Sequence, residues 1–472
     1  MQENELLSKD LLSHVKRIHF VGIGGSGMCP IAEILYHRGY ELTGSDTSES
    51  DTLQRVRSYG IPVHMGQKAE NIGNAQLVVY TAAVKPDNPE LVAAREKGIP
   101  TVERSVMLGM VTRKYPDCIA VSGTHGKTTT TALITQILID AGKDPSAVIG
   151  GRLPSIGANG RAGKSGIIVC EACEYVDTFL QLSPAVSIIL NIDNDHLDYF
   201  KTVDNIIRSF HKFAGQTSRT VIVNGDNPNA MKAVKDITNA QIVTFGFSAE
   251  NDYHAEDVEN TARARERFSV VTKDGRRARV TLSIPGRHNI YNALAAFAAA
   301  DRMGVETDRI VQSLHTFTGV HRRFELLGRF GGITIADDFA HHPTELTATL
   351  TAAKQMGFSR VWAVFQPHTY SRTYLLLDDF AKALRIADKV VLSEILAVRE
   401  KNTYHIYAKD LAAKIPGSVW FPTFEEIADY MVRNAADGDL ILTLGGGDIY
   451  KCANRIVEKY KAMQSETEND HV

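Results

Sequence analysis

The sequence predicts an α/β protein of three domains, each built on a largely parallel β-sheet. The chain has 472 residues, whereas a single hydrophobic core stops growing near about 250–300 residues, so more than one core is needed. Along most of the chain, apolar runs of strand length alternate with helix-like stretches, which is the pattern of parallel sheets covered by helices. We expect domains of residues 1–114, 115–328 and 329–472.

Composition and charge narrow the class of protein. Hydrophobic residues make up 44% of the chain and charged residues 23%, which are ordinary values for a globular protein. A net charge of −3 gives no basic surface for nucleic acid or an anionic membrane. The sequence has neither a long apolar stretch nor the pattern of a secretory signal, so we expect no membrane insertion. Five scattered cysteines favour a reducing compartment, and hence a cytoplasmic protein.

The first segment opens with a strand, a glycine turn and a helix over residues 18–35. Gly22, Gly24 and Gly27 fit the G-x-G-x-x-G pattern, and Asp46 follows after about 20 residues. Such a turn lets the backbone approach a diphosphate at the start of a helix. The pattern predicts a Rossmann-like domain and, taken alone, favours a nicotinamide-dependent enzyme.

The most informative stretch is a second glycine loop, VSGTHGKTTTT, at residues 121–131. It follows an apolar strand and opens a helix, so its N–H groups and the positive end of the helix meet at one place. Gly123 and Gly126 let the backbone curl. Lys127 can reach the terminal phosphates of ATP, and Thr128 is placed to hold Mg²⁺. A standard Walker A has an earlier glycine where this chain has valine, yet the loop predicts a central P-loop ATPase-like domain.

Acidic residues follow two later strands of the central segment. Ligands of open α/β sheets bind at the carboxyl ends of strands, and a phosphate-bound Mg²⁺ takes one or two protein carboxylates. We therefore expect metal ligands here. Cys170 and Cys173 form a Cys-x-x-Cys pair, but no second pair has matching spacing, so zinc is not expected. The candidate metal ligands are Glu171, Glu174, Asp193, Asp195, His196 and Asp198.

The pattern changes in the second half of the chain. Residues 266–284 alternate apolar and polar across an Asp-Gly turn, as an antiparallel hairpin does. An alanine-rich helix that ends at a glycine follows, over residues 289–304. A third α/β run starts near Arg329 and predicts a C-terminal Rossmann-like domain. The polar tail at residues 464–472 is expected to be disordered.

These motifs occur in an order that resembles one family. SGTHGKTTT, EACE, NIDNDHLDYF, GRHNIYNALAA, GVHRRFE and DDFAHHPTE follow one another as in the ATP-dependent Mur ligases, over residues 18 to about 451. The resemblance implies an enzyme of peptidoglycan synthesis, and thus of cell-wall biogenesis, cell shape and cell division. GIGGSGM, HHPTE and QPHTYSRT look most like the member that joins L-alanine to the lactyl carboxylate of UDP-N-acetylmuramate. That amide ligation would convert ATP to ADP and phosphate through an acyl phosphate.

The resemblance also assigns roles in the central segment. Lys127, Glu171 and His196 would form the catalytic set. Thr128, Glu171 and His196 would hold Mg²⁺, with two ions expected and Mn²⁺ as an alternative, while Glu174 stays open as a second carboxylate. The implied ATP-binding residues are Gly123, Thr124, His125, Gly126, Lys127, Thr128, Thr129, His288, Asn292, Arg323 and Asp338.

The resemblance implies that the other two substrates bind in the outer domains. The first glycine turn would hold the diphosphate of UDP, with Asp46 and Ser45 near the uridine. Which histidine deprotonates the amine of alanine stays open, and an arginine would pair with its carboxylate. The implied alanine-binding residues are His341, His342, His368 and Arg372. The implied UDP-sugar-binding residues are Gly24, Gly25, Ser26, Gly27, Met28, Asp46, His64, Thr81 and Ala82.

Three residues depart from the patterns of the family. Phe210 stands where the ligases that add a later residue carry a modified lysine, which argues against those sisters. Phe339 and Thr369 stand where tyrosine and arginine are expected, and both departures concern the residues expected to contact alanine. Selectivity among alanine, serine and glycine, the order of binding and feedback control stay open. The partners would be small molecules, and the protein a monomer or homodimer.

Three other functions compete with this one. A sister ligase that reattaches a recycled peptide to the same sugar nucleotide shares the motifs, although QPHTYSRT disfavours it. A nicotinamide-dependent oxidoreductase would explain the first turn, but neither the second loop nor the acids. A regulatory P-loop protein would hydrolyse ATP without any of the other substrates.

Overall fold

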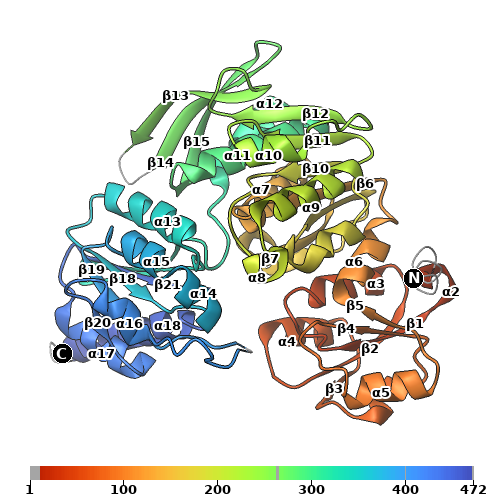
Figure 1. Cartoon of the computed structure of the whole chain (residues 1–472), viewed down its shortest axis with the longest axis horizontal. Coiled ribbons are helices and arrows are strands. Elements are labelled where there is room, and N and C mark those ends of the chain that lie inside the picture. The colour runs from red at the N-terminus through yellow and green to blue at the C-terminus, as the bar shows by residue number, and fades with distance from the viewer. Residues whose placement is uncertain (1–10, 262–264, 399, 470–472) are drawn as a thin grey trace. The chain divides into compact units, whose positions relative to one another are not determined.

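The computed structural model describes residues 11–261, 265–398 and 400–469. Within these ranges the strands form three sheets, and Figure 1 shows them in chain order from red to blue. By contacts, the chain divides into two compact units, each described by itself below. The first is Met1–Glu256, Ser269–Val280 and Tyr291–Phe317, and the second is Asp257–Phe268, Thr281–Ile290 and Thr318–Val472. The predicted α/β class with three largely parallel sheets is confirmed.

The first sheet and its helices use residues 11–112. The elements are α2 (Leu11–His14), β1 (Arg17–Val21), α3 (Cys29–His37), β2 (Glu41–Asp46), α4 (Asp51–Ser58), β3 (Val63–Met65), η1 (Ala69–Ile72), β4 (Leu77–Tyr80), α5 (Pro89–Glu96), β5 (Thr101–Glu103) and α6 (Arg104–Thr112). The five strands are all parallel, in the order β3-β2-β1-β4-β5. The chain winds outward in opposite directions from β1 and β4, and a ligand crevice forms at the carboxyl ends beside such a switch point.

The second sheet has ten strands and surrounds the central loop. Its elements are β6 (Asp117–Ser122), α7 (Lys127–Asp140), β7 (Ser146–Leu153), η2 (Pro154–Ile156), β8 (Ala158–Arg161), β9 (Ile167–Glu171), η3 (Tyr175–Gln181), β10 (Val186–Ile189), α8 (Leu197–Phe200), α9 (Val203–Gly215), β11 (Thr220–Asn224), α10 (Pro228–Ala233), β12 (Gln241–Gly246), β13 (Tyr253–Thr261), β14 (Arg265–Thr272), β15 (Arg277–Pro285), α11 (His288–Arg302) and α12 (Thr307–Thr316). The order is β15-β14-β13-β12-β11-β10-β6-β9-β7-β8. Because β6 lies between the parallel strands β9 and β10, the carboxyl ends of all three strands meet.

The predicted hairpin is present at the far edge of this sheet. β14 and β15 are neighbours, joined by a tight turn in which the Gly275 N–H donates to the Thr272 C=O at 2.8 Å. Gly275 has a φ of +84°, the left-handed backbone that an Asp-Gly turn requires. The antiparallel addition to a parallel sheet is therefore confirmed.

The third sheet has six strands and forms most of the second unit. Its elements are β16 (Glu325–Phe330), β17 (Ile333–Asp338), α13 (Pro343–Gln355), β18 (Val361–Phe365), α14 (Tyr370–Leu375), α15 (Leu377–Leu384), β19 (Lys389–Leu392), α16 (Ala408–Ala413), β20 (Val419–Trp420), α17 (Phe424–Asn434), β21 (Leu440–Leu444) and α18 (Tyr450–Asn469). The order is β16-β17-β21-β18-β19-β20, with β16 antiparallel to β17. The sheet therefore begins at Glu325, ahead of the expected boundary at residue 329.

The C-terminal tail differs from the prediction. Helix α18 continues to Asn469, so residues 464–469 are helical where disorder was expected. The apolar face of α18, including Ile456 and Tyr460, anchors the helix in the core. The polar end of the helix continues the same backbone hydrogen bonding, because extending a helix that is already formed is favourable. Residues 470–472 lie outside the described part of the chain.

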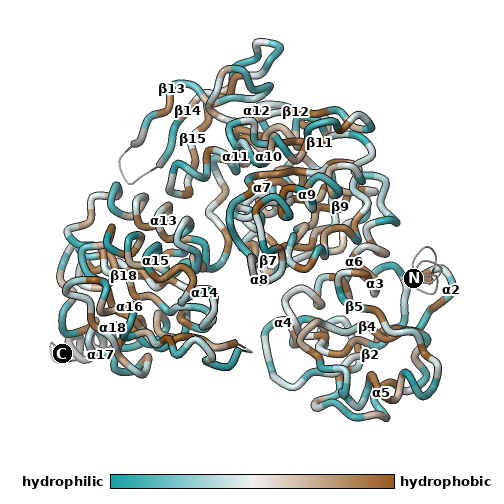
Figure 2. The backbone as a smooth tube through the Cα atoms, in the orientation of Figure 1, coloured by the Kyte–Doolittle hydropathy of each residue, from teal (hydrophilic) through white to brown (hydrophobic). Residues whose placement is uncertain are grey.

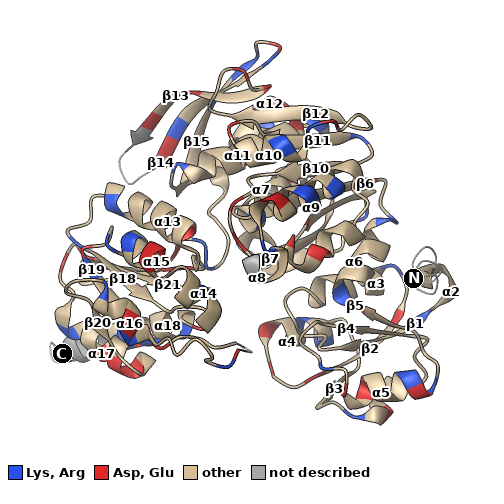
Figure 3. Ribbon diagram, viewed as in Figure 1, with Lys and Arg blue, Asp and Glu red and all other residues tan. Residues whose placement is uncertain are grey.

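Hydrophobic segments coincide with the strands of each sheet (Figure 2). Every residue of β17, β18 and β21 is buried, which is typical of parallel strands covered on both faces. Lys and Arg are interspersed with Asp and Glu along the whole ribbon (Figure 3). In the described ranges, no helix combines the length and the apolar character needed to span a membrane.

Candidate active site

Asp46 accepts hydrogen bonds from the backbone at the first glycine turn. Gly22 has a φ of +83°, and the Gly24 N–H donates to Asp46 Oδ2 at 2.9 Å. A Cβ added to Gly24 would lie 2.9 Å from the same oxygen, so only glycine fits there. Asp46 Oδ1 also accepts from the N–H groups of Thr47 and Ser48. Asp46 therefore shapes the turn that the sequence predicts for a diphosphate.

A pocket of about 780 Å³ opens beside this turn. It lies at the carboxyl ends of the central strands of the first sheet, where the switch point places a ligand. Four predicted UDP-sugar residues line it: Gly24, Gly25, Asp46 and Thr81. Sequence reasoning missed several other lining residues, including Thr47, Ser48, Gln67, Val84, Lys85 and Asn88.

The remaining predicted UDP-sugar residues do not line this pocket. His64 is exposed on β3, and Ala82 lies in the loop after β4. The predicted Met28 packs in the hydrophobic core, and its N–H donates to the Gly25 C=O at 2.9 Å. Ser45 is also turned inward, because its hydroxyl donates to Glu90 Oε2 at 2.6 Å.

Ser26 and Gly27 follow the turn at the start of α3. The described part of the protein does not use their N–H groups, which suits an anion at this helix end. The side chain of Arg104 passes beside Gly27, since an added Cβ would lie 3.2 Å from Arg104 Cδ. Arginine binds phosphate oxygens well, so Arg104 is a further candidate for the diphosphate. Sequence reasoning missed it because only the fold brings the start of α6 to this turn.

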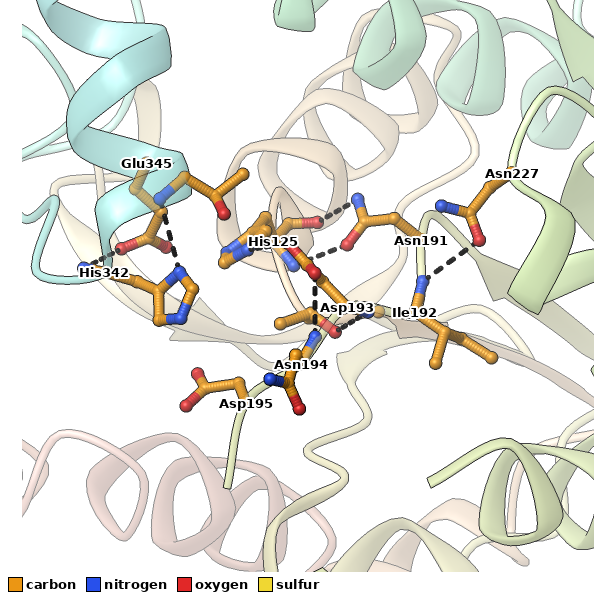
Figure 4. Close-up of polar contacts among 12 residues, drawn as sticks. His125, Asn191, Ile192, Asp193, Asn194, Asp195, Asn227, His342 and Glu345 are labelled. Carbon is orange, nitrogen blue, oxygen red and sulfur yellow. Dashed lines mark hydrogen bonds and ion pairs between the residues drawn. The ribbon is translucent and has the colours of Figure 1, made fainter. Parts of the chain in front are cut away.

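The central loop turns at two glycines with left-handed backbone. Gly123 has a φ of +137° and Gly126 a φ of +88°. A Cβ added to Gly126 would lie 2.4 Å from Asn292 Oδ1. Asn191 braces the loop from outside, because its amide accepts from the His125 N–H at 2.8 Å and donates to the His125 C=O at 3.1 Å (Figure 4). Asn191 therefore stabilises the curled conformation of the loop.

The end of β10 also supports the loop. The Asp193 N–H donates to Thr124 Oγ1 at 2.9 Å, and His125 Nε2 lies 3.5 Å from Asp193 Oδ2. Thr128 and Thr129 are buried in the first turn of α7, where N–H groups have no preceding turn of helix to bond. The predicted phosphate-binding residues 123–129 thus run from the glycine loop into the first turn of α7.

The ammonium group of Lys127 is held inside this loop. Its Nζ donates to the carbonyl oxygens of Gly123 and Thr124, and lies 3.0 Å from each carboxylate oxygen of Glu174. Burial by itself lowers the pKa of Lys127, but the nearby carboxylates, mainly Glu174, raise that pKa above its usual value. The lysine therefore keeps its positive charge, as a phosphate-binding group must.

Glu171 and His196 both lie near the pair of Lys127 and Glu174. Glu171 ends β9, accepts a hydrogen bond from the Gly150 N–H and helps to raise the pKa of Lys127. His196 has a φ of +55°, and its Nε2 lies 4.0 Å from Glu174 Oε1. Glu174 thus contacts Lys127 directly and lies near His196, a position that the sequence left open.

The described residues do not form a complete metal cage. No three His, Cys, Asp or Glu side chains among them converge as a metal cluster. Cys170 is buried and Cys173 half-buried, and both are free thiols. Burial, helped by Glu174, raises the pKa of the Cys173 thiol against the opposing effect of Lys127. The Asp198 side chain lies outside the described residues.

His288 and Asn292 lie four residues apart on one face of α11. Asn292 Oδ1 accepts from Thr130 Oγ1 at 3.2 Å, which ties α11 to the helix that follows the central loop. His288 packs against Gly286, which has a φ of +102° and whose added Cβ would lie 2.6 Å from His288 Cε1. Asn292 therefore lies beside the phosphate loop, where the prediction placed an ATP contact.

In the second unit, Asp338 is buried at the end of β17. Its oxygens accept from the N–H groups of Phe324 and Ala340, each at 2.7 Å. Burial raises the pKa of Asp338 to about 6, although the nearby Arg323 acts to lower it. The Arg323 guanidinium lies 5.1 Å from the centroid of the Phe339 ring. Arg323 and Asp338, both predicted ATP contacts, are therefore neighbours.

Arg322 organises a glycine loop that sequence reasoning did not single out. It donates to Asp337 Oδ2 at 2.8 Å, to the Gly445 C=O at 2.8 Å and to the Gly447 C=O at 2.7 Å. The loop Gly445–Gly447 follows β21, and an added Cβ on Gly446 would lie 3.0 Å from His341 Cγ. The sequence did contain a signal for this loop, namely three glycines directly after a buried strand. Glycines allow the backbone to approach other groups closely.

The predicted alanine-binding histidines have different surroundings. The rings of His341 and His368 lie 5.7 Å apart, and His341 Nδ1 lies 3.0 Å from the Phe339 carbonyl oxygen. Burial lowers the pKa of His368 to about 4, with smaller contributions from His341 and Arg372. His368 is therefore neutral near pH 7, and the fold brings it together with His341 and Arg372.

His342 caps the helix that follows it. It is buried at the start of α13, where its Nδ1 accepts from the Thr344 N–H at 3.3 Å. Glu345 completes the capping box by accepting from the His342 N–H at 3.3 Å (Figure 4). Such a cap stabilises a helix by about 1 kcal/mol. The cap accounts for His342 Nδ1 without any contact to alanine.

Three parts of the chain match descriptions of known protein domains. Residues 17–116 match "Mur ligase family, catalytic domain", residues 121–300 match "Mur ligase middle domain", and residues 322–447 match "Mur ligase, glutamate ligase domain". These ranges follow the three sheets closely, since the sheets begin at Arg17, Asp117 and Glu325.

Curated relatives and solved structures extend over nearly the whole chain. The UDP-N-acetylmuramate–L-alanine ligase of Acetivibrio thermocellus is 44% identical over 458 residues, which is 96% of this chain and 97% of that protein. The protein of the same name from Caldanaerobacter subterraneus subsp. tengcongensis is 43% identical over 456 residues, covering 95% and 99%. The crystal structure of the UDP-N-acetylmuramate-alanine ligase of Thermotoga maritima has a TM-score of 0.81 at 30% identity, covering 95% and 99%. A murein peptide ligase from Psychrobacter arcticus has a TM-score of 0.72 at 25% identity, covering 94% and 98%.

Proposed function

The chain belongs to the Mur ligase family, and on that premise we propose that it joins L-alanine to the lactyl carboxylate of UDP-N-acetylmuramate, using ATP. The observation that carries the proposal is the 44% identity to a ligase of that name over 96% of this chain and 97% of the relative. The reaction would be a step of peptidoglycan synthesis in the cytoplasm.

The chemistry needs an activated acid, because a carboxylate is a poor electrophile for an amine. In the proposed reaction a carboxylate oxygen attacks the γ-phosphorus of ATP, ADP leaves, and an acyl phosphate forms. Positioning and charge stabilisation supply most of the catalysis in phosphoryl transfer. Lys127 and the N–H groups of the curled loop 123–129 are the groups of this chain that would supply them.

The residues around Lys127 also fit a magnesium ion, the expected cofactor. A bound Mg²⁺ would supply positive charge that stabilises the negative charge on the phosphates. Thr128, Glu171 and His196 would hold it, with Mn²⁺ as an alternative ion and two ions expected. Glu171 is favoured over Glu174 because Glu174 is buried against Lys127, whereas Glu171 is half-exposed and accepts a hydrogen bond from the Gly150 N–H.

In the second step the amine of alanine must lose a proton; it then attacks the acyl carbon, and phosphate leaves as the amide forms. His368, with a pKa of about 4, is too weak a base near neutral pH. His341, whose ring lies 5.7 Å from that of His368, is therefore the candidate base. Arg372, which lies near His368, would pair with the alanine carboxylate.

The proposal extends to organisation and partners. Residues 1–114, 115–328 and 329–472 would bind the sugar nucleotide, ATP and alanine respectively, an assignment supported by the three sheets, of which the third reaches back to Glu325. The partners would be these small molecules, and the protein a monomer or homodimer. The free thiols of Cys29, Cys118 and Cys452 suit the reducing cytoplasm.

Phosphate release tests the proposal. Purified protein with ATP, Mg²⁺, UDP-N-acetylmuramate and L-alanine is expected to release phosphate, and omission of any one component is expected to stop it. Parallel assays with L-serine and glycine measure the selectivity. No release from the complete mixture would overturn the proposal, and release without the sugar nucleotide and amino acid would indicate a regulatory ATPase.

The murein peptide ligase of similar fold makes a recycling ligase the second candidate. A cell-wall tripeptide tested in place of L-alanine distinguishes the two. The proposed function predicts turnover with L-alanine and little with the tripeptide, and the reverse preference would assign the recycling reaction.

A further inference from the structure

Two amides face each other in the wall of the first pocket. Asn88 Nδ2 donates to Gln67 Oε1 at 2.6 Å, and both residues line the pocket of about 780 Å³. Gln67 lies just after β3, and Asn88 lies just before α5. The pair thus joins the edge strand of the sheet to the helix that follows β4.

Helix α5 determines which way Asn88 points. Asn88 is the N-cap of α5, and its Oδ1 accepts from the N–H groups of Glu90 at 2.9 Å and Leu91 at 3.4 Å. Only the amide oxygen can accept these bonds, so Nδ2 is left as the donor toward Gln67. Gln67 must then turn its oxygen to Asn88 and its Nε2 the other way. None of the described residues accepts a hydrogen bond from Gln67 Nε2.

The backbone that carries Gln67 is also held in place. The Gly66 N–H donates to the Asp46 C=O at 2.8 Å, and the Gly66 C=O accepts from Asn71 Nδ2 at 3.0 Å. Asn71 Nδ2 also donates to Glu90 Oε1 at 2.6 Å, and Glu90 is fully buried. A donor held this firmly needs little reorganisation when a ligand binds.

We propose that Gln67 recognises the pyrimidine base of the bound nucleotide diphosphate. Its Nε2 would donate a hydrogen bond to the O4 carbonyl oxygen and so select uracil over cytosine. The proposal deepens the proposed function and rests on it. The diphosphate belongs at the glycine turn after β1, and β3 lies two strands away, roughly 10 Å at the usual strand spacing. A ribose and a base span such a distance along the pocket.

The selectivity follows from one functional group. Uracil has a carbonyl oxygen at position 4, where cytosine has an amino group. A fixed donor bonds the uracil oxygen but faces the amino donor of cytosine, and a polar group left unpaired in this way costs roughly 10- to 100-fold in affinity. Gln67 would therefore be a specificity-determining residue and take no part in the chemical step.

Binding of UDP and CDP, measured by calorimetry on the full chain, tests the proposal. The wild type is expected to bind UDP at least about 10-fold more tightly than CDP. Gln67→Glu keeps an oxygen for Asn88 but presents a second oxygen to the base, so the preference for UDP is expected to vanish or reverse. Asn88→Asp keeps an oxygen to cap α5 but removes the Nδ2 donor. The Gln67 amide is then expected to rotate its Nε2 toward Asp, so the preference for UDP over CDP should fall in this variant too.

Ser48→Ala is the matched control, because Ser48 lines the pocket at the end of β2. It is expected to weaken UDP and CDP alike and to leave their ratio unchanged, as any merely structural loss would. If the wild type binds UDP and catalyses ligation, and the ratio of UDP affinity to CDP affinity is unchanged in both amide variants, the role of Gln67 is overturned and the proposed function is not. A wild type that binds neither UDP nor UDP-N-acetylmuramate would instead overturn the proposed function.

Discussion

Lys127 Nζ lies 3.0 Å from Glu174 Oε1, so the lysine that the sequence predicts to bind phosphate is paired with a buried acid. Without carboxylates nearby, burial would lower the pKa of this lysine. The pair therefore preserves the charge that a triphosphate needs, and ATP would replace the carboxylate as its partner.

Lys127→Ala is expected to lower the rate of phosphate release by about 100- to 1,000-fold or more, because a charge on the transferring phosphate loses its partner. The variant should also unfold at a lower temperature, since it leaves the buried Glu174 without its cation. The double variant Lys127→Ala/Glu174→Gln is the control, with stability regained and activity still absent. Ligation at a near wild-type rate in Lys127→Ala would remove the loop from the mechanism.

Glu171→Gln and Glu174→Gln distinguish the two candidate metal carboxylates. Glu171→Gln is expected to raise the Mg²⁺ concentration for half-maximal activity by about 10-fold or more, because a ligand is lost. Glu174→Gln is expected to leave that concentration nearly unchanged and to lower the rate through Lys127. Titration of Mg²⁺ at saturating ATP measures both, and the opposite pattern would assign the metal to Glu174.

Gly126→Ala is expected to abolish tight ATP binding. The new Cβ would lie 2.4 Å from Asn292 Oδ1, and a φ of +88° already strains alanine by about 1 kcal/mol or more. Gly142→Ala is the matched control, because Gly142 has a φ of +71° at the end of α7 and nothing within 4 Å of an added Cβ. The control should lose stability alone, so weaker ATP binding in Gly142→Ala would contradict the steric argument.

His368→Gln is expected to flatten the pH dependence of stability. The pKa of His368 in the folded protein is about 4, below its ordinary value of 6.5. Between these values the unfolded chain binds a proton that the folded chain does not, so the free energy of unfolding falls as the pH drops from about 6.5 to 4. Urea unfolding at several pH values measures this fall in the free energy of unfolding. In the variant the fall should be smaller than in the wild type by up to about 3 kcal/mol.

His64→Gln, at an exposed position of β3, serves as the control for this series. It is expected to keep the pH dependence of the wild type. Equal pH dependence in His368→Gln and the wild type would show that the environment of His368 does not resist its charge.

Local patterns in the sequence determined the architecture. Apolar runs separated by helical stretches predicted the parallel strands, and the Asp-Gly dipeptide predicted the turn between β14 and β15. Gly123, Gly126 and Lys127 predicted the phosphate loop, since left-handed backbone and a lysine at a helix start are properties of single positions and their spacing. Element type and loop chemistry depend on neighbours in the chain, which a sequence displays directly.

Only the tertiary structure decided which side chains meet. Lys127 pairs with Glu174, 47 positions away, and Asn88 orients Gln67 across 21 positions. Met28 was expected at the ligand and lies in the core, while Arg104 was not expected and lies beside the glycine turn. Such contacts depend on strand order, register and the packing of helices, because a shift of one residue turns a side chain to the opposite face of a sheet. Spacing along the chain carries no record of that choice.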